Sequence, residues 1–194
     1  MRTIRFLALI LFACNLSAVE TLRLPNIFGD KMVLQRGKPV RVWGWAKPNV
    51  EVTVAFAEQS KTAKANGEGQ WTLHLDKLTT SFKGRELAVS SGAEKITLTN
   101  LLVGEVWVCG GQSNMEWSLR ASRDSDLEVA SVDAPHIRFI RLPHVAWPDP
   151  KKDFPVANEI SSEGNWRQAI PEQVENCTAV GYYFAQRISR RLKV

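Results

Sequence analysis

The residues best able to do chemistry lie in one short stretch, VWVCGGQSNMEW (106–117), in which Ser113 follows two glycines. A serine nucleophile needs a raised backbone position, a nearby base and hydrogen-bond donors for the oxyanion. An apolar strand that ends at Gly110-Gly111 and leads into a helix would supply the raised position and free N–H groups. The G-x-S-x-G elbow is absent, because Met115 stands in place of its last glycine. From these residues alone, Ser113 is either a catalytic nucleophile or a structural hydroxyl in a tight turn, and the structural role is favoured.

The segment that leads to these residues is strand-rich. Short apolar alternations with a two-residue period, separated by turns, recur from Thr21 to about Asn100, with no helical stretch between them. This pattern predicts an antiparallel, immunoglobulin-like β-sandwich over residues 19–103. The predicted strands lie within 38–46, 49–57, 66–75, 84–91 and 94–103.

The pattern changes after Val103, where residues 104–194 indicate part of an α/β domain. EVWVC (105–109) is typical of a buried strand, and HIRFIRLP (136–143) predicts a second one. Irregular helices are expected within 114–132, and a loop over 147–166. Two strands are too few for a stable sheet, so we expect this domain to be truncated.

A helix is predicted after Thr178, which is its candidate N-cap. Apolar residues recur along it at helical spacing, and we expect this stripe to be core. Its members are Val180, Tyr183, Phe184, Ile188 and Leu192.

The first eighteen residues have the features of a secretory signal peptide: an early basic pair, an apolar stretch and a small-residue cleavage site. We therefore expect an exported protein, periplasmic or extracellular. A loose match to a bacterial lipobox offers an alternative in which Cys14 is lipidated and anchors the chain. The apolar stretch is too short for a stable span, and we expect no other membrane segment.

Charge and cysteine content exclude other classes. Without Arg2 and Arg5 the 25 basic residues fall to 23 against 20 acidic ones, a net charge of +3. This weak, scattered charge predicts no nucleic-acid partner. Arg187, Arg190, Arg191 and Lys193 lie at the end of the predicted helix, where its dipole favours cations. Cleavage leaves two cysteines, at positions 109 and 177, which could form a disulfide; we favour two free, buried thiols. No metal-ligand spacing accompanies the histidines.

Four segments resemble the sialate O-acetylesterase family of the SGNH (GDSL-like) hydrolase superfamily. GEVWVCGGQSNMEWSL (104–119) is similar to the nucleophile block of the family, and LPNIFGDKMVLQRGKPVRVWGWA (24–46) to its N-terminal opening. GQWTLHL (69–75) resembles a strand of its sandwich, and NCTAVGYYFAQRI (176–188) a helix segment. The matches run in the order of the family and cover nearly all of 21–194.

The resemblance implies acyl transfer at Ser113. This serine matches the nucleophile of Gly-Gln-Ser-Asn, and its own backbone N–H would be one oxyanion donor. Gln112 and Asn114 match the motif without an assigned chemical step; they either line the pocket or stabilise the turn. Glu116 and Trp117 either line the pocket entrance or, as we favour, cap and pack the first helix. The implied chemistry uses no metal and no organic cofactor.

In the family, the base comes from a C-terminal Asp-x-x-His motif, and further oxyanion donors come from later glycine and asparagine blocks. None of these blocks is found in this sequence. DAPH (133–136) matches the dyad only superficially, because it lies just before a predicted strand. His74 and His144 have no better claim.

The resemblance predicts removal of O-acetyl groups from sialic acid or related acetylated glycans, with essentially no activity for the 194-residue chain. Two alternatives stay open: an acetylesterase for another polysaccharide such as xylan, and a non-catalytic glycan-binding or interaction module. Exposure of Trp43 and Trp45 as a flat platform would favour binding. The oligomeric state is not predicted.

Overall fold

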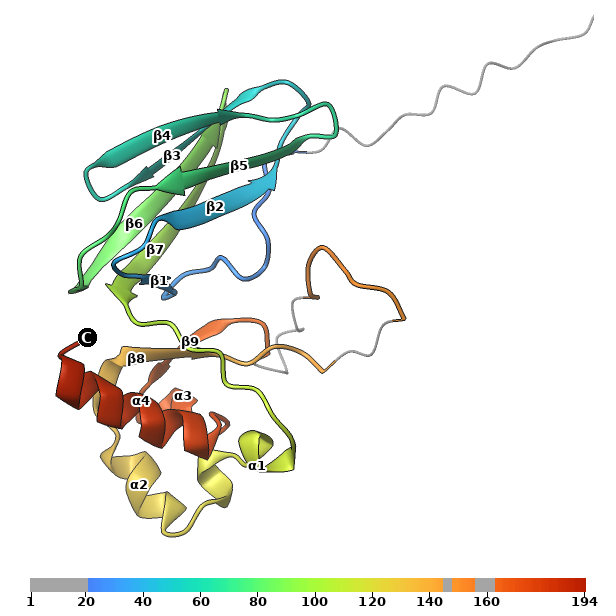
Figure 1. Cartoon of the computed structure of the whole chain (residues 1–194). Helices are drawn as coiled ribbons and strands as arrows, with labels where there is room; N and C mark the ends of the chain where they lie inside the picture. The colour runs from blue at the N-terminus through green and yellow to red at the C-terminus, as the bar shows by residue number, and fades with distance from the viewer. Residues whose placement is uncertain (1–20, 145–147, 156–162) are drawn as a thin grey trace, which may run out of the picture.

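The computed structural model describes residues 21–144, 148–155 and 163–194 (Figure 1). The predicted signal peptide, with Cys14, and part of the predicted loop lie outside these residues. The described chain is mixed and consists mostly of strands. None of its described helices is both long and apolar enough to cross a membrane.

The first half of the chain forms two sheets. One has five strands in the order β1-β7-β6-β3-β4, in which β1 and β7 are parallel; the other pairs β2 with β5. The five predicted strands are confirmed as β2, β3, β5, β6 and β7. The sequence did not reveal β1, which has three residues, or β4, which is mostly polar. The bounds are β1 Val33–Gln35, β2 Val40–Trp45, β3 Glu51–Phe56, β4 Gln59–Lys64, β5 Gln70–Leu75, β6 Ser81–Ser91 and β7 Glu94–Gly104.

A single apolar core lies between these sheets. Alternation places Val52, Val54 and Phe56 of β3 on one side, and all three are at most 1% exposed. Val42 of β2 and Leu75 of β5 are fully buried in the same cluster. Burying each such side chain contributes about 1.5–3 kcal/mol. The immunoglobulin-like assignment stays a prediction.

The second half has its own smaller core. β8 pairs antiparallel with β9, and α4 lies beside β8 (Figure 1). The strand predicted at 136–143 is confirmed as β8, whereas β9 and α3 were not predicted. The bounds are α1 Ser113–Glu116, a 3-10 turn Leu119–Ala121, α2 Ser125–Ser131, β8 Ala134–Ile140, β9 Trp166–Ala169, α3 Pro171–Val174 and α4 Ala179–Leu192.

The prediction of a buried strand at 105–109 is wrong. These residues follow β7 without regular structure; Trp107 is 56% exposed and Val108 is 97% exposed. A strand needs a neighbour for its backbone hydrogen bonds. Within the described part of the chain β8 pairs only with β9, so this segment gains no partner.

The helix predicted after Thr178 is confirmed, and its N-cap hydroxyl accepts from the Gly181 amide at 3.4 Å. The prediction that its apolar stripe is core is wrong. Val180, Tyr183 and Phe184 are 50%, 40% and 39% exposed. The buried face of α4 carries Tyr182 and packs against the small core beside β8. This face lies opposite the most apolar stripe of the helix.

Contacts between distant residues join the two halves. The Trp166 indole N–H donates to the Ile27 carbonyl at 2.8 Å, and the Asn26 amide donates to the Asp153 carboxylate at 3.0 Å. Because these groups are far apart in sequence, their bonds fix β9 and the segment around Asp153 against the residues that precede β1.

Candidate functional site

Ser113 is the first residue of α1, and its side chain is exposed. Of the two glycines before it, Gly111 allows a tight approach. A side chain at position 111 would place its Cβ 2.7 Å from Cγ of Met115, which folds back over the turn. The Met115 amide also donates to the Gln112 carbonyl at 2.8 Å. This turn thus holds Ser113 at the surface.

Hydrogen bonds attach this turn to the start of α4. The Ala179 amide donates to the Trp117 carbonyl at 2.8 Å, and the Leu119 amide donates to the Cys177 carbonyl at 2.9 Å. Leu119 is fully buried in the smaller core. The backbone after Ser113 is therefore held in place by the buried Leu119 side chain and by the hydrogen bonds of Trp117 and Leu119 to the start of α4.

Gln112 and Asn114 flank Ser113, and both are exposed. Gln112 is the N-cap residue of α1 without a side-chain capping bond. The first amides of a helix have no partner inside it. The Ser113 N–H is one of these amides, as an oxyanion donor would have to be.

Glu116 and Trp117 interact with different parts of the chain. The Trp117 indole donates to the Ala121 carbonyl at 2.7 Å, which packs the ring against the following turn. The Glu116 carboxylate lies 3.0 Å from Nε2 of His144. Because Glu116 follows Ser113 by three residues, the two side chains share one helical face. His144 therefore lies near the nucleophile turn, a proximity that no sequence spacing indicates.

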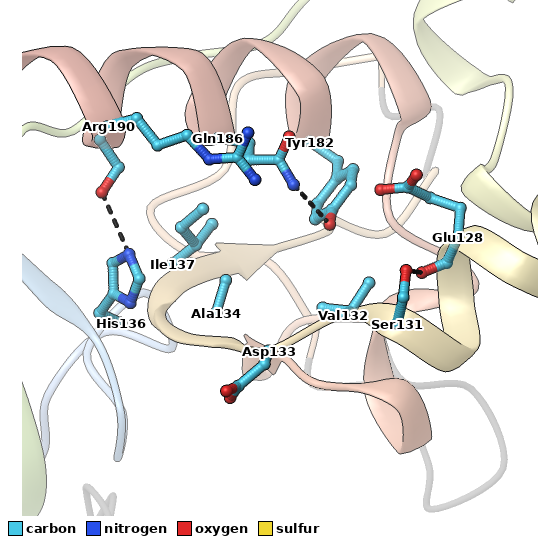
Figure 2. A pocket seen from close by; sticks show the side chains of 11 residues that line it. Glu128, Ser131, Val132, Asp133, Ala134, His136, Ile137, Tyr182, Gln186 and Arg190 are labelled. Carbon is cyan, nitrogen blue, oxygen red and sulfur yellow. Dashed lines mark hydrogen bonds between the residues drawn. The ribbon is translucent and has the colours of Figure 1, made fainter.

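His136 lies elsewhere, in a cavity of about 410 Å³ beside β8 and α4 (Figure 2). Its Nε2 atom is 3.1 Å from the Ser189 hydroxyl. Burial, and then the nearby Arg138, lower the pKa of His136. Ser189 is ten residues beyond Ala179, where the Ser113 turn is attached, a separation of about 15 Å along the helix. His136 is a strand residue of β8, and Asp133 occupies the connection between α2 and β8.

His74 is exposed on β5, opposite Arg41 of β2, in the other half of the chain. Within 21–144, 148–155 and 163–194, no three His, Cys, Asp or Glu side chains form a group that could hold a metal ion.

Both described cysteines are free, as expected. Cys177 is buried, and burial together with the nearby Cys109 raises its pKa to about 12. The prediction that both thiols are buried is wrong for Cys109, which lies in the exposed segment before Gly110.

The two tryptophans of β2 do not make a flat, exposed platform. Trp45 is 7% exposed, and the Arg23 guanidinium lies 3.8 Å above its ring. Trp43 is half-buried and meets the edge of Phe28 with ring centroids 4.9 Å apart. Both rings belong to the packing of the strand-rich half.

Comparison with known proteins gives consistent relatives, although no family model matches the chain. It is 30% identical to sialate O-acetylesterase from Homo sapiens in an alignment 140 positions long, which covers 66% of this chain and 26% of the human protein. The match to the same protein from Pongo abelii has the same identity and coverage. A solved carbohydrate acetylesterase from Xanthomonas citri is 32% identical with a TM-score of 0.84, covering 90% of this chain and 38% of that one.

The chain thus spans about a quarter of the length of the curated relatives that it matches. Sequence and structure comparisons agree on enzymes with closely related names. Over the matched residues the chain is similar to members of the sialate O-acetylesterase family.

Proposed function

We propose that this chain carries the nucleophile of a serine-dependent carbohydrate acetylesterase. The observation that supports this most directly is the position of Ser113, exposed at the start of α1 directly after Gly110-Gly111. Its relatives are named sialate O-acetylesterase and carbohydrate acetylesterase. The proposed substrates are O-acetylated sialic acids or related acetylated glycans, with acetylated xylan as the alternative.

In the proposed reaction, Ser113 Oγ attacks the carbonyl carbon of an acetyl ester. A base takes the hydroxyl proton, and the Ser113 N–H donates to the developing oxyanion. The C–O bond to the sugar breaks, and the sugar hydroxyl leaves with the proton. Water then attacks the acetyl-enzyme and releases acetate, which restores the serine. Gln112 and Asn114 are proposed to line this site.

We further propose that residues 21–194 alone release essentially no acetate. Nε2 of His136 lies 3.1 Å from the Ser189 hydroxyl, and Nε2 of His144 lies 3.0 Å from the Glu116 carboxylate. Ser113 therefore lacks a bonded imidazole within the described residues, and a serine without its base keeps only a small part of its rate enhancement.

The fold assignment that accompanies this proposal is an immunoglobulin-like sandwich over 19–103 and the first part of an SGNH-type, flavodoxin-like domain over 104–194. The two apolar cores lie on either side of that boundary. We also propose export directed by residues 1–18, with lipidation of Cys14 as the alternative.

A chimera tests the activity. Residues 21–194 replace the matching part of the Xanthomonas citri enzyme, and acetate release is measured on O-acetylated sialic acid and on acetylated xylan. Ser113→Ala should reduce kcat by at least about a thousandfold, and Ser131→Ala, an exposed serine on α2, should leave it unchanged. Undiminished turnover by the Ser113→Ala chimera would refute the assignment. The ester from which acetate is released faster is the better candidate for the natural substrate.

A further inference from the structure

Glu116 and His144 form a polar pair on the exposed surface beside the nucleophile turn. Oε1 of Glu116 lies 3.0 Å from Nε2 of His144, and the two side chains are 49% and 68% exposed. Water screens the attraction within a pair that is so exposed, so the pair contributes little to folding. It contributes more to the chemical character of this surface than to stability.

The pair lies on the side of the turn that carries Ser113. Ser113 is the first residue of α1 and Glu116 is the last, and side chains three residues apart lie on one face of a helix. A Cβ added at Gly110 would meet no atom within 4 Å, so the surface around this glycine is open. A sugar whose acetyl group has reached Ser113 spans the distance of about 5–6 Å between such neighbouring side chains.

His144 restrains the direction of the Glu116 side chain. It lies beyond the end of β8, whereas Glu116 belongs to α1, so the contact joins two separate parts of the chain. This contact uses one carboxylate oxygen, and Oε2 of Glu116 accepts no hydrogen bond from the residues in 21–144, 148–155 and 163–194. Because the side chain is already restrained, less conformational entropy is lost when Oε2 accepts from a ligand.

The carboxylate determines which groups of a substrate this surface favours. An ionised carboxylate only accepts hydrogen bonds, and the free hydroxyl groups of a sugar are donors. Hydrogen bonds from hydroxyls to carboxylates are stronger than those to neutral acceptors. A carboxylate also repels a second negative charge at short range. This surface therefore favours an ester with free hydroxyl neighbours over an ester beside a carboxylate.

We propose that Glu116 is a specificity-determining residue whose Oε2 accepts a hydrogen bond from a free hydroxyl near the acetylated oxygen of the sugar. His144 is its positioning residue and acts only through the Glu116 carboxylate. Neither residue moves the proton of Ser113. The inference rests on the proposed function, because it places the sugar next to that serine.

The test compares two esters in the chimera described above. One is p-nitrophenyl acetate, which has no hydroxyl group, and the other is the glycan ester from which acetate is released faster. Glu116→Gln should lower kcat/KM on the glycan ester at least about tenfold, mainly through a higher KM, because a neutral amide is a weaker acceptor. On p-nitrophenyl acetate, kcat/KM should stay within about twofold of its original value.

Glu68→Gln is the matched control. The Glu68 carboxylate is exposed and accepts from the Gln70 side chain at 3.2 Å, but it lies in the strand-rich half of the chain. This variant should keep both kcat/KM values. All substituted side chains are exposed, so unchanged thermal melts verify that the variants are folded.

Two substitutions of His144 test its positioning role. His144→Gln keeps an amide nitrogen near the place of Nε2 and should keep most of the kcat/KM on the glycan ester. His144→Ala should lose about as much as Glu116→Gln, and the losses should not add in the double variant, because both remove the same interaction.

The proposal is overturned if Glu116→Gln leaves the KM for the glycan ester unchanged, or if it slows both esters equally. Turnover of both esters as low as that of Ser113→Ala would make the pair the catalytic base and would also overturn it. A binding measurement separates this inference from the proposed function. In the Ser113→Ala chimera, Glu116→Gln should raise the Kd of the glycan ester, measured by calorimetry, at least about tenfold. Such a rise, together with undiminished turnover by Ser113→Ala, would contradict the proposed function but support the role of Glu116.

Discussion

Gly181→Ala sets helix propensity against packing at the junction of α4 and the nucleophile turn. Alanine is favoured over glycine in a helix interior by about 1 kcal/mol. A Cβ at this position would lie 2.5 Å from Cγ2 of Thr178, the N-cap residue whose hydroxyl accepts from the Gly181 amide. Displacing that side chain removes the cap, which costs about 1 kcal/mol, and crowding adds about 1–3 kcal/mol. We expect the free energy of unfolding to fall by about 1–3 kcal/mol in urea denaturation.

The control removes only the methyl group that causes the clash. Thr178→Ser keeps the capping hydroxyl, and the nearest remaining atom to the new Cβ is Cys109 Sγ at 3.3 Å. In this background, Gly181→Ala should be neutral or stabilising by up to about 1 kcal/mol, so the double-mutant cycle gives a coupling of about 2 kcal/mol. If Gly181→Ala alone raises stability, or if the serine background leaves its effect unchanged, the packing argument is refuted.

Three further outcomes are expected. A thiol reagent at pH 8 should modify exposed Cys109 while Cys177 stays unmodified in the folded chain, because burial raises the Cys177 pKa to about 12; peptide mapping checks this. Burial lowers the pKa of His136, so the unfolded state binds more protons near its ordinary value of about 6.5. The free energy of unfolding should therefore be highest above that pH and should decrease as the pH falls below it. In urea titrations, the His136→Asn variant should lose less of this free energy between pH 7 and pH 5. Trp166→Phe removes the 2.8 Å bond to the Ile27 carbonyl and should cost about 1 kcal/mol, measured as a lower urea midpoint; an unchanged midpoint would exclude a contribution from this bond.

Strands that alternate strictly were predictable from sequence, whereas those formed by long-range pairing were not. In β3, Val52, Val54 and Phe56 recur every second residue, which is the period of a half-buried strand. β1 forms only because residues 33–35 lie parallel to β7, about seventy positions away. β9 forms by pairing with β8, and its indole bonds to the N-terminal segment. Their pairing partners, not their composition, determine these strands.

The candidate site shows the same division. The position of Ser113 after two glycines was predictable, because the turn is local and Gly111 is required by the approach of Met115. The pairing of Glu116 with His144 was not, because it joins two loops through tertiary contacts. The apolar character of Val108 and Phe184 predicted burial, and this prediction is wrong, because within the described residues no segment covers them.

The contacts of the first described residues also constrain the order in which this chain can fold. The bond from Asn26 to Asp153 spans 127 residues, and the bond from Trp166 to Ile27 spans 139 residues, so neither can form before the later residue has been synthesised. During synthesis the strand-rich half can close around its own core early, but these two bonds form only after most of the chain has left the ribosome. Contacts of such high sequence separation slow the final step of folding. The N-terminal segment from Leu22 to Phe28 is thus expected to be the last part of the larger core to become protected from hydrogen exchange during refolding.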